Sequence, residues 1–242
     1  MNIPAKTGGI LPLNILILDT ATSIEIVAIR YEGTIADKSS ATQNSHSVTL
    51  FSSIDDACKE LGITIHDINC IAVGIGPGSF TGIRIAVTTA RMLAQILEVP
   101  LVGIHTQMLY ACSIVTDNVD CIVAFDAKKS RVFAARYRIQ QGKLPEVVIP
   151  PGDYPIKNLC EIDANRHIIA IGDGALKYNN EMTALIKNIT FLPDFLPQPE
   201  AMFTMIENLY FNNPQKYADY HQVVPFYSRK SDAEIMKELK NK

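Results

Sequence analysis

The sequence predicts an α/β protein built from two duplicated lobes. Apolar strand-like runs alternate with segments whose apolar residues recur every three or four positions, as in helices that pack on a sheet. A strand–turn–strand pattern with an Asp at the turn opens each half of the chain, first as ILILDTATSIEIVAIRYEG and again as CIVAFDAKKSRVFAARYRIQQG. The chain has 242 residues, of which 48% are hydrophobic, and this is enough for a sizeable core.

The first half is expected to hold five strands and three helices. The strands are short runs rich in apolar or β-branched residues, at 14–18, 24–31, 34–40, 68–75 and 101–104. The run at 68–75 is apolar without interruption, which is typical of a strand buried on both faces. The helices follow the three- and four-residue spacing of apolar residues, over 46–61, from 83 to just before Pro100, and over 107–113.

The second half repeats the hairpin and then continues with strands, helices and connections. After the second hairpin we expect a strand at 167–171, helices near 175–187, 200–210 and 233–240, and an extended segment at 223–227. The stretch 144–155 contains several prolines, and we interpret it as a connection because proline cannot donate to a strand ladder. The predicted domains are an N-terminal extension over 1–13, one lobe over 14–113 and a second lobe over 114–242.

Composition limits the class of protein. A formal net charge of −3 gives no overall attraction to nucleic acid, so RNA contacts are expected to come through another subunit. The five cysteines form no CxxC pair, which argues against both a zinc site and a disulfide framework. No apolar stretch approaches the ~18 residues of a membrane span, and the first 13 residues lack a signal-peptide pattern. We expect a cytoplasmic chain with no membrane contact.

The loop GIGPGSFTGIR, residues 74–84, is where α/β proteins place phosphates, but neither known phosphate motif is complete. No lysine occupies the P-loop position, and Ser79 stands where the dinucleotide fingerprint needs its third glycine. Pro77 also removes one amide donor. We therefore favour a sharp exit turn, with Ser79 or Thr81 capping the next helix and small residues allowing another helix to approach closely.

The turn of the first hairpin is the second candidate site. Asp19, Thr20 and Thr22 sit where some ATP-binding folds hold magnesium and phosphate, and the alternative is an Asx turn in which the carboxylate bonds nearby amides. The second turn has Asp126 without an adjacent glycine or hydroxyl, so we do not expect the two turns to hold ATP between them.

Other catalytic chemistry is not indicated. No two histidines lie three or four residues apart, so no helix offers two imidazoles to a metal, and no metal is expected. The segment 78–82 has its serine directly after the glycine and is not the GxSxG of hydrolases. The cluster Lys128-Lys129-Ser130-Arg131 reads as a solvated turn, with a contact to RNA or a nucleotide as the alternative.

Five segments together resemble the TsaB (YeaZ) family, a paralogue of TsaD in the M22 glycoprotease-like superfamily. They are ILILDTATSIEIVAI, the His46-Ser47 helix start, GIGPGSFTGIRIAVTTARMLA, FDAKKSRVFAARY and PFYSR. The piece GPGSFTGIR is the most specific, and the resemblance covers most of the chain from residue 14. It implies an actin/Hsp70/sugar-kinase-like (ASKHA, RNase H-like) fold with two duplicated lobes.

The resemblance also implies a non-catalytic subunit of the complex that transfers threonylcarbamoyl to adenosine 37 of tRNA (t6A formation). The subunit would act as scaffold and activator of TsaD, with TsaE as an ATPase partner, and would form a homodimer when alone. It would contact tRNA only indirectly and need no cofactor, although residual ATP or ADP binding stays open. The alternative is a stand-alone glycoprotease-like peptidase or an ATP-dependent small-molecule kinase of the same fold.

On this basis we interpret the loop at 74–84 as the start of a helix that packs on a partner. The predicted interface consists of His46, Ser79, Phe80, Gly82, Arg84, Ala86, Ala90 and Ala94. A charge placed at Ala90 is expected to weaken assembly while each lobe stays folded.

Overall fold

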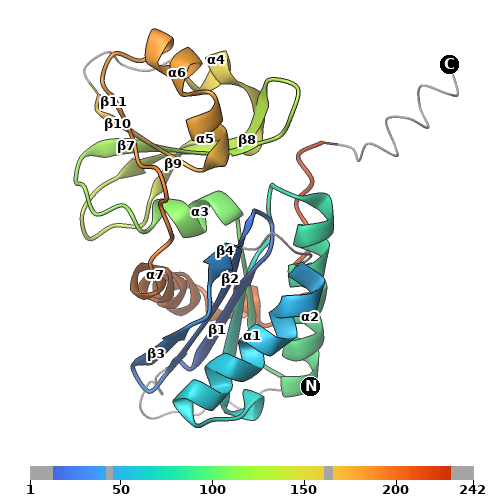
Figure 1. The fold of residues 1–242 in the computed structure, drawn as a ribbon. Helices are drawn as coiled ribbons and strands as arrows, with labels where there is room; N and C mark the ends of the chain where they lie inside the picture. Colours follow the sequence, from blue (N-terminus) through green and yellow to red (C-terminus); the bar gives the residue numbers. More distant parts are fainter. Residues whose placement is uncertain (1–12, 42–45, 161–165, 230–242) are drawn as a thin grey trace, which may run out of the picture.

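The computed structural model describes residues 13–41, 46–160 and 166–229, which contain two mixed β-sheets (Figure 1). The first sheet has the order β3-β2-β1-β5-β6, and the short strand β4 also pairs with β2. Its strands are β1 (Ile15–Asp19), β2 (Ile24–Tyr31), β3 (Thr34–Asp37), β4 (Ser40–Ala41), β5 (Cys70–Gly74) and β6 (Leu101–Ile104). The second sheet has the order β11-β10-β7-β8-β9. Its strands are β7 (Val119–Asp126), β8 (Arg131–Ile139), β9 (Glu146–Pro155), β10 (Ile168–Ile171) and β11 (Ile189–Phe191).

The two sheets share one topology. In the first, β1 pairs antiparallel with β2, β2 pairs antiparallel with β3, and β1, β5 and β6 run parallel. In the second, β7, β8 and β9 repeat the antiparallel pairings, and β7, β10 and β11 repeat the parallel ones. The predicted duplication is therefore confirmed, and this strand order and direction are those of the actin/Hsp70/sugar-kinase-like fold.

Helices cover both faces of the first sheet. α1 (His46–Leu61) and α2 (Phe80–Leu97) lie side by side on one face, and α3 (Thr106–Ala111) and α7 (Pro199–Asn212) bury apolar residues against the other. The short helices α4 (Ile156–Leu159), α5 (Asp173–Lys177) and α6 (Asn179–Leu185) pack on the second sheet. Three single 3-10 turns complete the described elements, η1 (Ile65–Asp67), η2 (Pro214–Tyr217) and η3 (Tyr220–Gln222).

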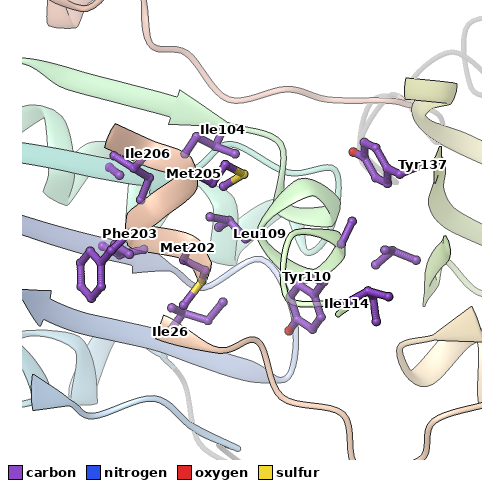
Figure 2. Packing of buried hydrophobic residues seen from close by; sticks show 14 of the residues in the cluster. Ile26, Ile104, Leu109, Tyr110, Ile114, Tyr137, Met202, Phe203, Met205 and Ile206 are labelled. Atoms are coloured by element: carbon purple, nitrogen blue, oxygen red, sulfur yellow. The ribbon is translucent and has the colours of Figure 1, made fainter. Parts of the chain in front are cut away.

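Helix α7 comes from the C-terminal half of the chain but packs on the first sheet. Its residues Met202, Phe203 and Ile206 lie among side chains of the first sheet and of α3 (Figure 2). Arg30 of β2 also forms an ion pair with Glu207 of α7. One hydrophobic core therefore continues from the first sheet through α3 and α7 to the second sheet. The division of the chain at residue 113 stays a prediction.

Most differences from the expected elements fall in the second half. The predicted connection over 144–155 is wrong, because Glu146–Pro155 forms strand β9. β9 pairs only with β8 at the edge of the sheet, where prolines are tolerated and register shifts occur. The single helix expected over 175–187 is two helices that meet at Tyr178, and strand β11 was not predicted.

Two predictions concern segments beyond the described residues. The N-terminal extension, apart from Leu13, and the terminal helix over 233–240 lie outside them. Among the helices of the described part, none is long and apolar enough to cross a membrane. The cytoplasmic location stays a prediction.

Candidate functional site: the cleft between the lobes

A cleft of about 500 Å³ lies where the two hairpin turns meet. We call residues 19–23 the first tip and residues 126–130 the second tip. The cleft is lined by both tips, the loop before α2, the start of α5 and the C-terminal strap, which we define as residues 223–229. A volume of this size falls in the range of small-molecule sites, which is about 300–1,000 Å³. The cleft is therefore the candidate functional site.

The first tip is an Asx turn whose polar groups are used within the lobe. Asp19 is buried, and its Oδ1 accepts a hydrogen bond from the Ala21 amide at 2.6 Å. A Cβ at Gly74 would lie 1.8 Å from Asp19 Oδ2, so only glycine leaves room for this carboxylate. The Thr20 hydroxyl donates to the Gly82 carbonyl at 2.6 Å. Of the three residues predicted to bind a cofactor, only Thr22 lines the cleft. A nucleotide at this tip stays a prediction.

The loop before α2 is an exit turn and a helix cap, as predicted. Gly76–Pro77 is a cis peptide bond, and the Ser79 side chain caps α2 by accepting a hydrogen bond from the Gly82 amide at 3.3 Å. The Ser79 amide donates to the Ala21 carbonyl at 2.7 Å. A Cβ at Gly78 would lie 2.3 Å from the Ala21 carbonyl oxygen, so the first tip rests directly on this turn. Gly78 and Gly82 therefore leave room for the first tip to pack closely on this turn, and not for another helix.

The structure corrects the predicted partner interface. Ala86, Ala90 and Ala94 are fully buried and pack on the first sheet, and Gly82 is buried against Thr20. Because they have no exposed surface, the prediction that they face a partner is wrong. A charge at Ala90 would therefore be buried in the lobe, which contradicts the expectation that the lobe stays folded.

The other predicted interface residues have different positions. Ser79 and Arg84 are exposed, Phe80 is half-buried, and Ser79 and Phe80 line the cleft. His46 is the first residue of α1, but its side chain lies outside the described part of the structure. A contact between these four residues and a partner protein stays a prediction.

The strap brings together two motifs that lie far apart in the sequence, GPGSFTGIR and PFYSR. The Phe226 amide donates to the Ile75 carbonyl at 2.8 Å. The Tyr227 ring stacks on Phe80 with centroids 4.5 Å apart, and Arg84 Nε donates to the Tyr227 hydroxyl at 2.7 Å. The Arg84 guanidinium also lies 3.9 Å above the Phe80 ring. The strap is therefore fixed beside the N-terminus of α2 by backbone, stacking and cation–π contacts.

Two side chains join the lobes at the cleft. Arg229 of the strap donates to the Ala127 carbonyl of the second tip at 3.0 Å, and its guanidinium lies 5.3 Å from the Phe133 ring centroid. Gln107 of α3 is fully buried, and its Nε2 donates hydrogen bonds to the Pro77 carbonyl at 3.1 Å and to the Phe133 carbonyl at 3.4 Å. These contacts hold both lobes around the cleft, and sequence spacing gave no signal for them.

The second tip repeats the Asx turn of the first but carries cations. Asp126 accepts the Lys128 amide at 2.9 Å, and its other oxygen accepts the ammonium groups of Lys177 at 2.7 Å and Lys128 at 3.1 Å. Burial alone would raise the pKa of the Asp126 carboxyl, but these hydrogen bonds outweigh burial and hold that pKa well below its ordinary value. The hydrogen bond to Asp126 likewise raises the pKa of Lys177. The Asp126 carboxylate is therefore held in its charged form, paired with both ammonium groups.

The start of α5 is the counterpart of the start of α2. A Cβ at Gly174 would lie 2.8 Å from the Asp126 amide nitrogen, just as Gly82 approaches the first tip. Asp173 accepts the amides of Asp126 at 3.2 Å and Gly174 at 3.0 Å. Sequence reasoning missed Asp173 as a cleft residue and Lys177 as a partner of Asp126. The sequence Gly172-Asp173-Gly174 after a strand was the available signal, because the duplication makes it the equivalent of the loop at 74–84.

The fold and the cleft define a two-lobed protein of the actin-like class whose tips meet across a small interlobe site. Residues 30–237 match the family model described as "TsaD: tRNA N6-adenosine threonylcarbamoyltransferase", so the chain belongs to this family. The sequence resemblance to TsaB (YeaZ) proteins is confirmed by curated relatives with that name.

The Bacillus subtilis "tRNA threonylcarbamoyladenosine biosynthesis protein TsaB" is 25% identical over 230 residues, which cover 92% of this chain and 96% of that protein. The Escherichia coli protein of the same name is 33% identical over 146 residues, 57% of this chain and 63% of that protein. The chain therefore spans less than two thirds of the Escherichia coli relative.

Solved structures agree on the fold. "YeaZ from Pseudomonas aeruginosa" has a TM-score of 0.77 at 23% identity, and the match covers 89% of this chain and 100% of that one. A second Pseudomonas aeruginosa structure, described as similar to peptidase YEAZ, has a TM-score of 0.77 at 24% identity and covers 90% of this chain.

Proposed function

We propose that this chain is a non-catalytic subunit of the assembly that forms threonylcarbamoyladenosine in tRNA, and that it binds and activates a larger TsaD-like paralogue. The names of its relatives place those proteins in this biosynthesis. The structure adds support from the first tip, where Asp19 and Thr20 bond within the lobe. A subunit of this kind needs no cofactor of its own.

The observation that carries the proposal is the apolar outward surface of α1 and α2. Phe51 of α1 is 52% exposed, and Met92 and Ile96 of α2 are 42% and 63% exposed. The inner sides of both helices are buried in one cluster, so these side chains are not needed for the lobe itself. Large apolar side chains exposed on two adjacent helices are a feature of surfaces that another protein covers.

This surface replaces the buried alanines as the partner face. The revised partner face still includes Arg84, which is exposed on α2. It also still assigns partner binding to helices α1 and α2. Because the partner is a paralogue, the same surface serves a homodimer when the chain is alone. TsaE-like ATPase and tRNA would then join through the larger paralogue.

The test is the threonylcarbamoyladenosine content of bulk tRNA, measured by mass spectrometry after depletion of this protein in its own organism. We expect the modified nucleoside to fall and to recover with the wild-type chain. Recovery should fail with Ile96→Glu, because a charge placed in an apolar contact between two proteins costs roughly tenfold or more in affinity. Thr183→Glu in α6, an exposed helical position on the second lobe, is the matched control.

Unchanged tRNA after complete depletion would contradict the proposal. The runner-up function, a stand-alone peptidase or an ATP-dependent kinase, would then be tested by calorimetry of the isolated chain with ATP. Binding tighter than ~100 μM would favour that function.

A further inference from the structure

Two hollows flank helix α7, which lies on the opposite face of the first sheet from α1 and α2 (Figure 1). The larger has a volume of about 460 Å³ and is lined by α7, the end of α3 and the turn between β8 and β9. The smaller has about 350 Å³ and is lined by α7, the hairpin of β2 and β3, and Leu13. Neither shares a lining residue with the interlobe cleft.

The two hollows meet along one ridge of α7. Glu200 and Thr204 line both of them, whereas Glu207 lines only the smaller and Ala201 and Met205 line only the larger. At about 100° per residue, the two sets of side chains face directions roughly a third of a turn apart. A helix with its side chains is about 10 Å wide, so about three extended residues of another segment can cross the ridge. We call the two hollows together the α7 groove.

The α7 groove is apolar at its base and balanced in charge. Ile114 and Met205 are buried at its base, whereas Val115 at its rim is 91% exposed. Of the charged lining residues, Arg30 and Glu207 form an ion pair with each other, and one cation and one carboxylate remain, Lys143 and Glu200. Such a groove suits an occupant with apolar side chains and little charge, and not a nucleic acid or a highly charged peptide.

The N-terminal part of this chain enters the groove. Leu13 is buried in the same core cluster as Met202 and Met205 of α7, and it lines the smaller hollow. Residues 1–12, which precede it, lie outside the described part of the structure. Their sequence MNIPAKTGGILP is mostly apolar, and Lys6 is its single charged side chain. Twelve extended residues reach about 40 Å, which is well beyond the width of α7.

From the entry point, the lining and the charge of the groove, we propose that residues 1–12 dock in the α7 groove of their own chain. Ile10 and Leu11 would cross the ridge of Glu200 and Thr204, and the residues before them would cover Val115. The groove joins α7, which packs on the first sheet, to the β8–β9 turn of the second sheet. The docked segment is then a second tie between the lobes, at the end of β8 opposite to the strap. This inference does not rest on the proposed function.

The first test is the rate at which Val115→Cys reacts with N-ethylmaleimide in the full chain, followed by peptide mapping in a mass spectrometer. Mapping separates this thiol from the five native cysteines. In an open groove the thiol would be freely accessible, because Val115 is 91% exposed. With the segment docked it should react at least fivefold more slowly, and the added changes Ile10→Asp and Leu11→Asp should restore the fast rate, because charged side chains leave an apolar groove.

Leu185→Cys is the matched control for labelling. Leu185 is 53% exposed on α6 and lines neither hollow. Its rate should be the same with and without the two aspartates. An equal rate at this site also shows that the aspartates have not unfolded the protein.

The second test keeps Ile10 and Leu11 and compares two disulfides under mild oxidation. Thr7→Cys is combined with Val115→Cys in one protein and with His66→Cys in the other. His66 is exposed beside Asp67, whose carbonyl accepts from Asn14 Nδ2 at 3.1 Å, so an undocked segment would reach this site as well. A disulfide needs Cα atoms within about 7 Å, so docking should make the bridge to position 115 form at least tenfold faster.

Three results would overturn the inference. The first is Val115→Cys that reacts equally fast with and without the two aspartates. The second is slow labelling that disappears on dilution, which would make the occupant a second copy of this chain. The third is equal rates of bridge formation at positions 115 and 66, which would show that the segment has no preferred site.

Discussion

Gly82→Ala tests whether the first tip rests on α2. In an exposed helix interior this change stabilises by about 1 kcal/mol, because alanine has the better helix propensity. At Gly82 the new Cβ would lie 1.8 Å from the Thr20 carbonyl oxygen and 2.9 Å from its carbon. These are backbone atoms, which cannot rotate away as a flexible side chain can.

The magnitude follows from three contributions. Overpacking of this kind costs about 1–3 kcal/mol, and the tip must also move away from its hydrogen bond to the Gly82 carbonyl, worth about 1 kcal/mol. After the gain in helix propensity, we expect a net loss of about 2 kcal/mol in the free energy of unfolding. For a chain of this size that lowers Tm by about 4–8 °C.

The assay is thermal and urea unfolding followed by circular dichroism. Thr88→Ala, at an exposed position of the same helix, is the matched control and should be neutral or slightly stabilising. A Gly82→Ala variant that is as stable as the wild type would refute the contact between the tip and the helix.

Three further changes test other parts of the fold. Ala90→Glu places an unpaired charge at a fully buried site, so soluble folded protein should be lost, as checked by expression and circular dichroism. Burial lowers the pKa of His105 below its ordinary value of 6.5. The free energy that this neutral histidine contributes to folding should therefore be fully present above pH 6.5 and fall as the pH drops below that value. His105→Gln should make the free energy of unfolding less dependent on pH, as measured by urea titrations between pH 5 and 7. Asp120 is fully buried, and its Oδ2 accepts from Arg136 Nε at 2.8 Å, so Asp120→Asn should cost about 3 kcal/mol in the free energy of unfolding; a change below 1 kcal/mol would contradict this.

The sequence predicted the elements whose local pattern and tertiary role agree. His46–Leu61 and Leu101–Ile104 have the bounds expected of them, because apolar spacing marks a helix face and a continuous apolar run marks a buried strand. The first lobe was therefore predicted nearly in full. The duplicated hairpins also placed the two tips correctly.

The rest depended on tertiary context. Prolines made Glu146–Pro155 look like a connection, but an edge strand does not need all of its amides. The alanines of α2 were taken for a surface because small residues allow close approach, and sequence does not say whether a sheet or a partner is approaching. The cleft itself joins residues from Ala21 to Arg229, and spacing along the chain carries no signal for such distant contacts.

The two tips have diverged in what their side chains do, and this decides how variants of each should be interpreted. At the first tip, Asp19 and Thr20 are buried and bond to the backbone of their own lobe. A substitution there perturbs folding first, so any loss of function must be compared with the loss of stability. At the second tip, Lys129 is exposed, and its φ of 53° lies in the left-handed region that favours glycine. A substitution there changes charge without removing a packing contact. Function lost at the second tip by a protein of equal or greater stability is therefore attributable to binding, whereas the same loss at the first tip is not.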